Sequence, residues 1–289
     1  MSLAAVEDGQ REFSFSDQDF QSLARLARAE FGLSLAESKK PLVYSRLARR
    51  LRARKVGSFQ QYLTLLETAD ESEERLELIS ALTTNVTSFF REKHHFETLK
   101  SELSPDFGKT GKARIWSAGC SSGQEPFSIA LTLLETIPDA ARRDIRILAT
   151  DIDPAVVSRA KRGRYSNEEK SAIAPALQSK WTRLCPDAPS AFEFNEEIRK
   201  MISFGELNLM VGWPFKGPFD AIFCRNVAIY FDHETQQKLW SKFADKLRPG
   251  GYLFIGHSER VTGPAMDGFT TAGVTTYRKI AGSGSALEN

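Results

Sequence analysis

Apolar residues recur at helical spacing through the first part of the chain. Ser16 can cap a first helix that ends at Gly32, and Pro41 opens a second helix. Apolar residues three and four positions apart mark two further helices, the last ending near Thr84. The positions that define the first, third and fourth helices are Phe20, Leu23, Ala27 and Phe31; Phe59, Tyr62, Leu63 and Leu66; and Leu76, Ile79 and Leu82. The pattern predicts an all-α N-terminal domain with its linker over residues 1–88.

Beyond this domain, short apolar runs alternate with helical stretches, which is typical of a mostly parallel α/β sheet. Strands are predicted around residues 113–118, 145–150, 219–224, 252–256 and 274–279. Residues 192–197 and 198–204 are predicted to form a β-hairpin around a polar turn. The hairpin lies in an insertion of about 164–206 within a second domain that spans 89–280, and residues 281–289 are predicted to be a flexible tail.

Two polar loops, far apart in the sequence, each follow a predicted buried strand. The first contains Gly119 and Gly123, and the second contains Asn226 and Val227. Ligands bind at the carboxyl ends of the strands in an open α/β sheet. Glycines let the backbone approach a ligand closely, and the residues after Gly123 can begin a helix whose amides face it. Asp151, at the end of the neighbouring strand, is placed to accept hydrogen bonds from ribose hydroxyls.

The chain lacks the usual phosphate-binding motifs. It contains no GxxxxGKS/T sequence, and the Gly119 loop departs from GxGxxG, so the sequence shows no obvious binding site for a pyrophosphate. An adenosyl ligand without phosphates fits better, and S-adenosylmethionine meets that description. The three cysteines are far apart and lack CxxC spacing, which argues against both a disulfide framework and a zinc site. No metal is therefore expected.

Composition sets wider bounds on the protein. A chain of 289 residues with 41% hydrophobic content can bury a large domain and a smaller one. No apolar run approaches the roughly 20 residues that span a bilayer, and the first residues lack the apolar core of a signal peptide. We therefore expect a cytoplasmic protein without membrane insertion. The net charge of +2 provides little of the broad positive field expected for nucleic-acid binding.

The most one-sided charge run lies between Lys39 and Lys55, which holds no acidic residue. Val43, Leu47 and Leu51 form an apolar stripe that is expected to dock on the protein. The arginines of this run are expected to project elsewhere, toward an acidic partner or as an ordinary solvated face. The three that we assign to the projecting face are Arg46, Arg49 and Arg50.

Several segments of the chain resemble, in the same order, those of the chemotaxis receptor methyltransferases, the CheR family. They are TNVTSFFRE (84–92), WSAGCSSGQEP (116–126), TDID (150–153), NL (208–209), CRNVAIYF (224–231), LRPGG (247–251) and HSE (257–259), and the resemblance covers about residues 15–280. It implies a Rossmann-like S-adenosylmethionine-dependent methyltransferase domain with a small antiparallel β-subdomain insertion, preceded by an all-α N-terminal domain. It also implies methyl transfer to glutamate carboxylates of chemoreceptors, with S-adenosylhomocysteine as the second product.

The resemblance also implies roles for individual residues. Arg91 and Tyr230 are expected to be catalytic, although a tyrosine after a strand is as often a packing residue. Arg46, Arg49 and Arg50 are expected to bind a glutamate-rich receptor helix, and the β-subdomain either binds a receptor C-terminal peptide or merely extends a sheet. The cofactor-binding residues that the resemblance implies are Asn85, Thr87, Arg91, Gly119, Glu125, Asp151, Asn208, Leu209, Asn226 and Val227.

Some alternatives stay open. Glu125 suits the start of a helix for purely structural reasons, apart from any attraction to the methionyl ammonium. The fold could bind S-adenosylmethionine as a sensing module without methyl transfer. A methyltransferase acting on RNA or a small molecule would show a wider basic surface or an aromatic stacking platform, and Phe89 and Phe90 are the only candidates for such a platform. A monomer is the plainest expectation for the oligomeric state.

Overall fold

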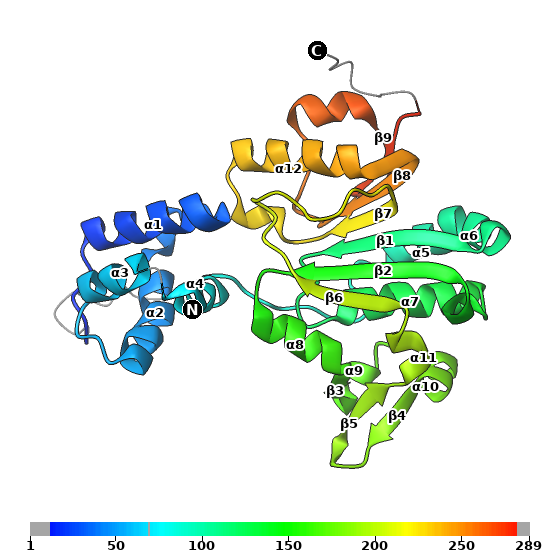
Figure 1. The fold of residues 1–289 in the computed structure, drawn as a ribbon, viewed down its shortest axis with the longest axis horizontal. Helices are drawn as coiled ribbons and strands as arrows, with labels where there is room; N and C mark the ends of the chain where they lie inside the picture. Colours follow the sequence, from blue (N-terminus) through cyan, green and yellow to red (C-terminus); the bar gives the residue numbers. More distant parts are fainter. Residues whose placement is uncertain (1–11, 69, 282–289) are drawn as a thin grey trace, which may run out of the picture. The chain divides into compact units, whose positions relative to one another are not determined.

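The computed structural model describes residues 12–68 and 70–281, which form two compact units (Figure 1). The first unit runs to Thr84 and includes Tyr230–Asp232. The second comprises Asn85–Ile229 and the residues from His233 onward. The chain therefore leaves the second unit for three residues and returns to it. The tail predicted to be flexible lies, beyond residue 281, outside the described residues.

The first unit is helical, as the apolar spacing predicts. Its elements are α1 (Asp17–Phe31), η2 (Glu37–Lys39), α2 (Lys40–Arg54), α3 (Phe59–Glu67) and α4 (Ser72–Leu82). The Ser16 side chain accepts the Asp19 N–H, and Asp19 accepts from the Ser16 N–H in return, so the helix start is capped on both sides. Gly32 ends α1 in the left-handed conformation at φ 72°. In α4, Leu78 is buried rather than the expected Leu76.

The second unit is built on a seven-stranded sheet in the order β6-β2-β1-β7-β8-β10-β9. Strands β6, β2, β1, β7 and β8 pair in parallel, and β10 and β9 add two antiparallel strands at one edge. The strands are β1 (Lys112–Ala118), β2 (Asp144–Asp151), β6 (Ile202–Glu206), β7 (Phe219–Cys224), β8 (Leu247–Ile255), β9 (Phe269–Gly273) and β10 (Thr276–Lys279). The last strand predicted, around 274–279, corresponds to β10, and β9 before it is a strand that the sequence did not predict.

Helices join most of these strands (Figure 1). They are α5 (Lys93–Thr98), η3 (Leu99–Leu103), α6 (Ser104–Thr110), α7 (Gln124–Thr136), η4 (Ala140–Arg142), α8 (Pro154–Arg162), α9 (Asn167–Lys170), α10 (Pro175–Trp181), α11 (Glu196–Arg199), η5 (Ala228–Tyr230), α12 (His233–Lys246) and η6 (Gly263–Gly268). Among the described residues no helix is long and apolar enough to cross a bilayer.

The strand order fixes where a ligand site can form. From β1 the chain moves outward to β2 and β6, and then it returns to place β7 on the other side of β1. The order therefore reverses between β1 and β7, and open α/β sheets bind ligands at this switch point. The loops that follow β1 and β7 are the two polar loops that the sequence singles out.

The predicted hairpin is wrong. β5 (Ala188–Phe194) pairs with β4 (Thr182–Cys185) and β3 (Arg164–Ser166) in a separate antiparallel sheet. β6 instead joins the main sheet beside β2, where Ile202 pairs with Ile147. The two strands part because the Asn195 side chain accepts the Ile198 N–H at 3.2 Å and starts α11 between them.

The small sheet packs against the main domain through aromatic rings. Phe194 of β5 stacks on Phe127 of α7 with ring centroids 4.2 Å apart. Phe89, in the segment that leads into α5, meets the Tyr165 ring of β3 edge-on at 5.0 Å. This buried cluster holds the segment before α5 and the small sheet to the same helix.

Candidate active site

Gly119 lets the loops after β1 and β7 meet. A side chain at this position would place its Cβ 2.3 Å from Val227 Cγ2, which is too close for any residue but glycine. The loop also uses the left-handed backbone region at Gly119, with φ 83°. The N–H groups of Gly119 and Cys120 both donate to the Thr150 carbonyl, at 2.8 and 2.9 Å. The loop after β1 therefore touches the ends of β2 and β7.

Asp151 closes this loop from the end of β2. Its Oδ2 accepts the Ser121 N–H at 2.8 Å, and its Oδ1 accepts the Asp153 N–H at 3.1 Å. Burial raises the pKa of Asp151, and these backbone hydrogen bonds oppose that rise. A carboxylate has about four acceptor positions, so Asp151 retains acceptor capacity for hydroxyl groups of a ligand. Asp153 caps α8 by accepting the Ala155 N–H.

Asn85 brings the segment before α5 to the same place. Its side-chain amide donates to Asp153 Oδ2 at 3.3 Å, and its carbonyl accepts the Ser121 hydroxyl at 3.2 Å. Thr87 is half-buried a little further along this segment. Both residues therefore belong to the unit that holds the sheet.

Arg91 lies where the same segment turns into α5. The backbone is unusual here, because Phe90 and Glu92 have φ values of 53° and 56°. The Phe90 N–H donates to Ser128 Oγ at 2.9 Å, which ties the turn to α7. The half-buried Arg91 side chain donates from Nη1 to the Val86 carbonyl at 3.1 Å. Its other guanidinium nitrogens have no hydrogen-bond partner among the described residues, which leaves donors for a carboxylate.

Glu125 begins α7 beside the loop after β1. Its Oε1 accepts the Ser117 hydroxyl at 2.6 Å, and its Oε2 lies 3.2 Å from Arg225 Nη1. Burial raises the pKa of Glu125, and the Arg225 charge and the Ser117 hydroxyl act in the opposite direction. Glu125 is therefore a buried acid with a buried cation beside it.

Arg225 is a residue of this site that the sequence analysis missed. Besides Glu125, its guanidinium contacts Glu92 at 3.3 Å between Nε and Oε2 and donates to the Arg91 carbonyl. The available signal was an arginine directly after an apolar strand, inside the CRNV segment. Its partners lie 100 and 133 residues away, so no local pattern could identify them.

A buried acid also holds the loop after β7. Asn226 is left-handed, with φ 60°, and its N–H donates to Glu259 Oε2 at 3.0 Å. Glu259 also accepts the N–H groups of Gly256 at 2.5 Å and Ile229 at 3.2 Å. Burial raises the pKa of Glu259 against these hydrogen bonds. Three backbone donors on one carboxylate thereby fix the loop that carries Asn226 and Val227.

Asn208 and Leu209 follow β6. The Asn208 side chain accepts the Met210 N–H at 2.9 Å, and Leu209 is buried. Lys242 of α12 donates its ammonium to the Leu209 carbonyl at 2.7 Å, which anchors this loop. All of the residues predicted to bind the cofactor therefore lie in the segment before α5, at the ends of parallel strands or in the loops after them, or in the first turn of α7.

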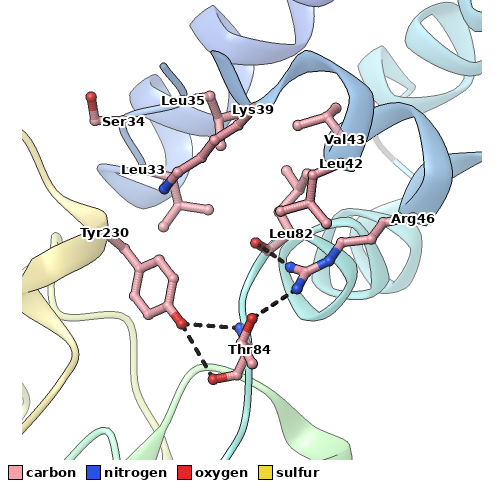
Figure 2. A pocket seen from close by; sticks show the side chains of 10 residues that line it. All are labelled: Leu33, Ser34, Leu35, Lys39, Leu42, Val43, Arg46, Leu82, Thr84 and Tyr230. Carbon is pink, nitrogen blue, oxygen red and sulfur yellow. Dashed lines mark hydrogen bonds between the residues drawn. The ribbon is translucent and has the colours of Figure 1, made fainter. Parts of the chain in front are cut away.

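Tyr230 belongs to the first unit. Its hydroxyl accepts the Thr84 N–H at 3.1 Å and donates to the Thr84 carbonyl at 3.2 Å, as Figure 2 shows. Its own carbonyl accepts the Ser34 N–H at 2.7 Å. Tyr230 lines a small pocket of the helical unit with apolar residues and two cations. The pocket residues are Leu33, Ser34, Leu35, Lys39, Leu42, Val43, Arg46, Leu82, Thr84 and Tyr230.

The expectation that all three arginines project away from the protein is wrong for two of them. Arg50 binds Glu74 through Nε at 3.0 Å and Nη2 at 2.6 Å, and it binds Glu77 at 2.7 Å. Arg46 donates to carbonyls at the end of α4, among them that of Leu82 at 2.9 Å. Acids from α4 thus face the basic run. Arg49 is exposed and forms no hydrogen bond or ion pair with another described residue.

No group of three or more metal-ligating side chains occurs within residues 12–68 and 70–281. The three cysteines are buried free thiols. Phe89 is buried, so of the two aromatic residues considered as a stacking platform only Phe90 retains exposed surface.

Comparisons with known proteins agree with this architecture. The family descriptions "CheR methyltransferase, all-alpha domain" and "CheR methyltransferase, SAM binding domain" match residues 18–83 and 85–278. The chain is 45% identical to a probable chemotaxis protein methyltransferase of Rhizobium etli, covering 86% of this chain and 95% of that protein. It is 40% identical to the chemotaxis protein methyltransferase of Escherichia coli, covering 91% of each. It is 42% identical to chemotaxis protein methyltransferase 2 of Pseudomonas aeruginosa, covering 87% and 89%. The chain therefore belongs to the CheR methyltransferase family, with an all-α domain followed by an S-adenosylmethionine-binding methyltransferase domain.

Proposed function

We propose that the protein transfers the methyl group of S-adenosylmethionine to glutamate side chains of chemoreceptors, giving glutamate methyl esters and S-adenosylhomocysteine. The observation that carries the proposal is the site at the switch point between β1 and β7, where Gly119 and Val227 meet with acids on both sides. The relatives named as chemotaxis protein methyltransferases support the choice of substrate.

The residues at this site fit S-adenosylmethionine. Asp151 has acceptor positions left for ribose hydroxyls, and Glu125 lies nearby as a second acid for the methionyl ammonium. Buried Leu209 offers apolar surface to a base. The cofactor carries positive charge on its sulfonium and its ammonium, which suits a site whose acidic side chains are buried. When bound, the cofactor supplies an electrophilic methyl group.

The proposed reaction requires little proton transfer by the protein. A glutamate side chain with a pKa of about 4.3 in water is already ionised at pH 7, so its oxygen can attack without a general base. The protein must align this oxygen with the methyl carbon and exclude water, which lowers the barrier by several kcal/mol. Arg91 supplies the donors that hold the carboxylate. A single charged contact suffices, because a tighter pairing would quench the nucleophile.

The helical unit is the proposed receptor-binding domain. Arg49 and Lys39 are exposed cations on and before α2, and a glutamate-rich receptor helix offers complementary charge. Arg50 contributes indirectly, because its bonds to Glu74 and Glu77 hold α2 on α4. β3 and β4 are the two edge strands of the small antiparallel sheet, and an edge strand suits a receptor C-terminal peptide that adds a strand. A monomer acting in the cytoplasm, where receptor helices are accessible, completes the proposal.

The test is transfer of a radiolabelled methyl group from S-adenosylmethionine to a cytoplasmic chemoreceptor fragment. We expect a label that is released by mild base, as carboxyl methyl esters are. Arg91→Ala should reduce the rate by about 100-fold or more while cofactor binding persists, since an alignment contact is lost.

Arg142→Ala is the matched control, because Arg142 is an exposed arginine in η4, at the start of β2 and away from the carboxyl ends of the strands. It should leave the rate unchanged. A base-stable label would favour a different acceptor atom. A protein that binds the cofactor but labels no receptor would favour the sensing module.

A further inference from the structure

Arg225 is a buried cation at the end of β7 to which the proposed reaction gives no part. Its side chain is 3% exposed. One guanidinium reaches Glu125 in α7, Glu92 at the start of α5 and the Arg91 carbonyl. It also lies 5.6 Å from the centroid of the Phe96 ring. Arg225 therefore joins three segments that meet at the site.

The cluster around Arg225 holds more negative than positive charge. Its two carboxylates, Glu92 and Glu125, have side chains that are each 11% exposed. His95 adds no charge at pH 7, because burial and the Arg225 charge lower its pKa to about 3. His257 is 65% exposed and meets Glu92 through its N–H and its Nδ1, each at 3.1 Å. A largely buried cluster with one cation and two anions favours a ligand that brings a second cation.

We infer that Arg225 is a positioning residue, which keeps Glu125 ionised and oriented toward the cofactor ammonium and holds the Arg91 backbone beside it. Glu92 is the second acid, which fixes Arg225 from the other side and supplies the excess negative charge. The inference rests on the proposed function, because it assumes that Glu125 meets the methionyl end of S-adenosylmethionine.

The electrostatic balance at Glu125 explains why an arginine is needed there. Burial is the largest influence and raises the Glu125 pKa, and Glu92 raises it further. Arg225 and the Ser117 hydroxyl lower it. Burial raises the pKa values of the nearby Cys120 and Cys224 thiols far above neutrality, so neither adds charge at pH 7. Without Arg225, the remaining influences favour a protonated Glu125, which attracts an ammonium group only weakly.

The test is the pH dependence of cofactor affinity in the full-length protein. Calorimetric titration with S-adenosylmethionine between pH 6.5 and 8.5 would compare wild type with Arg225→Met, Arg225→Lys and the double variant Arg225→Met, Glu125→Gln. The amino group of the free cofactor titrates alike in all of them. The ratio of the variant Kd to the wild-type Kd at each pH therefore reports groups of the protein alone.

For Arg225→Met we expect a ratio that is large at low pH and falls as pH rises, by at most about tenfold per pH unit below the raised Glu125 pKa. The Kd ratio falls with rising pH because deprotonation of Glu125 restores its attraction for the cofactor ammonium. Arg225→Lys keeps a cation, so its ratio should be flat. The double variant has no acid to titrate at position 125, so its ratio should be flat as well. Arg142→Ala should give a ratio of one.

A flat ratio for folded Arg225→Met would overturn the inference, since a merely structural loss weakens binding equally at every pH. If thermal melting shows that this variant does not fold, cofactor binding by Glu92→Gln provides the test instead. It removes the excess negative charge, and we expect it to weaken cofactor binding by about threefold or more. Unchanged or tighter binding would overturn the inference. Failure of the proposed function would look different, because wild type would then bind the cofactor without labelling a receptor.

Discussion

Gly119 shows how one absent side chain shapes the cofactor loop. In Gly119→Ala the new Cβ would lie 2.3 Å from Val227 Cγ2, so the loops after β1 and β7 must separate. We expect cofactor affinity to fall by more than tenfold and stability to fall by about 1–3 kcal/mol. Titration calorimetry and chemical denaturation would measure the two effects.

Gly111→Ala is the matched control. Gly111 also has a positive φ, of 67°, but its added Cβ would meet nothing within 4 Å. It should cost about 1 kcal/mol of stability and leave cofactor affinity intact. Adding Val227→Ala to Gly119→Ala removes the clashing methyl group and should restore part of the affinity. Equal affinity losses in the two glycine variants would refute the clash as the cause.

Arg49 and Arg50 are neighbours in α2, but they should differ in their contributions to stability and to receptor binding. Arg50→Ala leaves Glu74 buried without its main partner, and we expect a loss of about 2–4 kcal/mol in the free energy of unfolding. Arg49→Ala should change stability by less than about 0.5 kcal/mol but raise the KM for the receptor. Denaturation and methylation kinetics on both variants check this. Similar stability losses at the two positions would contradict the difference in partners.

At the scale of elements, the small sheet is connected to the cofactor loop. Tyr165 of β3 donates its hydroxyl to the Ser122 carbonyl at 2.8 Å in a buried position. Gln124, which begins α7, donates to Glu169 of α9 at 2.7 Å. The insertion therefore braces the loop between Gly119 and α7.

Tyr165→Phe tests this brace. Loss of one buried hydrogen bond of about 1 kcal/mol should weaken cofactor binding about fivefold, with kcat almost unchanged. Tyr252→Phe, at a buried tyrosine of β8, is the control and should have no effect on cofactor binding. A fall in kcat at constant cofactor affinity would assign Tyr165 to the transfer step instead of the loop.

Local signals decided which elements could be predicted. Ser16 and Gly32 mark the ends of α1 in the sequence itself. The hairpin failed because alternation along the chain does not say which strand lies alongside, and β6 is placed by pairing with β2. The same limit applies to the site. Asp151 ends an apolar strand, so it could be predicted as a site residue. The contacts of Arg225 are with Glu92 and Glu125, which are distant in sequence, so no local pattern identifies it.

At the scale of the whole molecule, the two proposed ligands call for two kinds of charge. The acids of the proposed cofactor site are largely buried, as at Glu125 and Asp151, whereas the cations of the proposed receptor-binding surface, such as Arg49 and Lys39, are exposed. Salt screens exposed charges over a Debye length of about 10 Å at 0.1 M and affects buried charges much less. The KM for the receptor and the KM for S-adenosylmethionine should therefore respond differently to salt.

Raising ionic strength from 0.05 to 0.3 M should increase the KM for the receptor several-fold and change the KM for S-adenosylmethionine by less than about twofold. Initial rates with each substrate varied in turn would measure both. Arg49→Ala should flatten the salt dependence for the receptor, because one of the screened charges is already gone. Arg142→Ala, exposed but outside the receptor-binding unit, should keep it. Equal salt dependence of the two KM values would mean that the receptor is recognised through contacts other than the exposed cations of the helical unit.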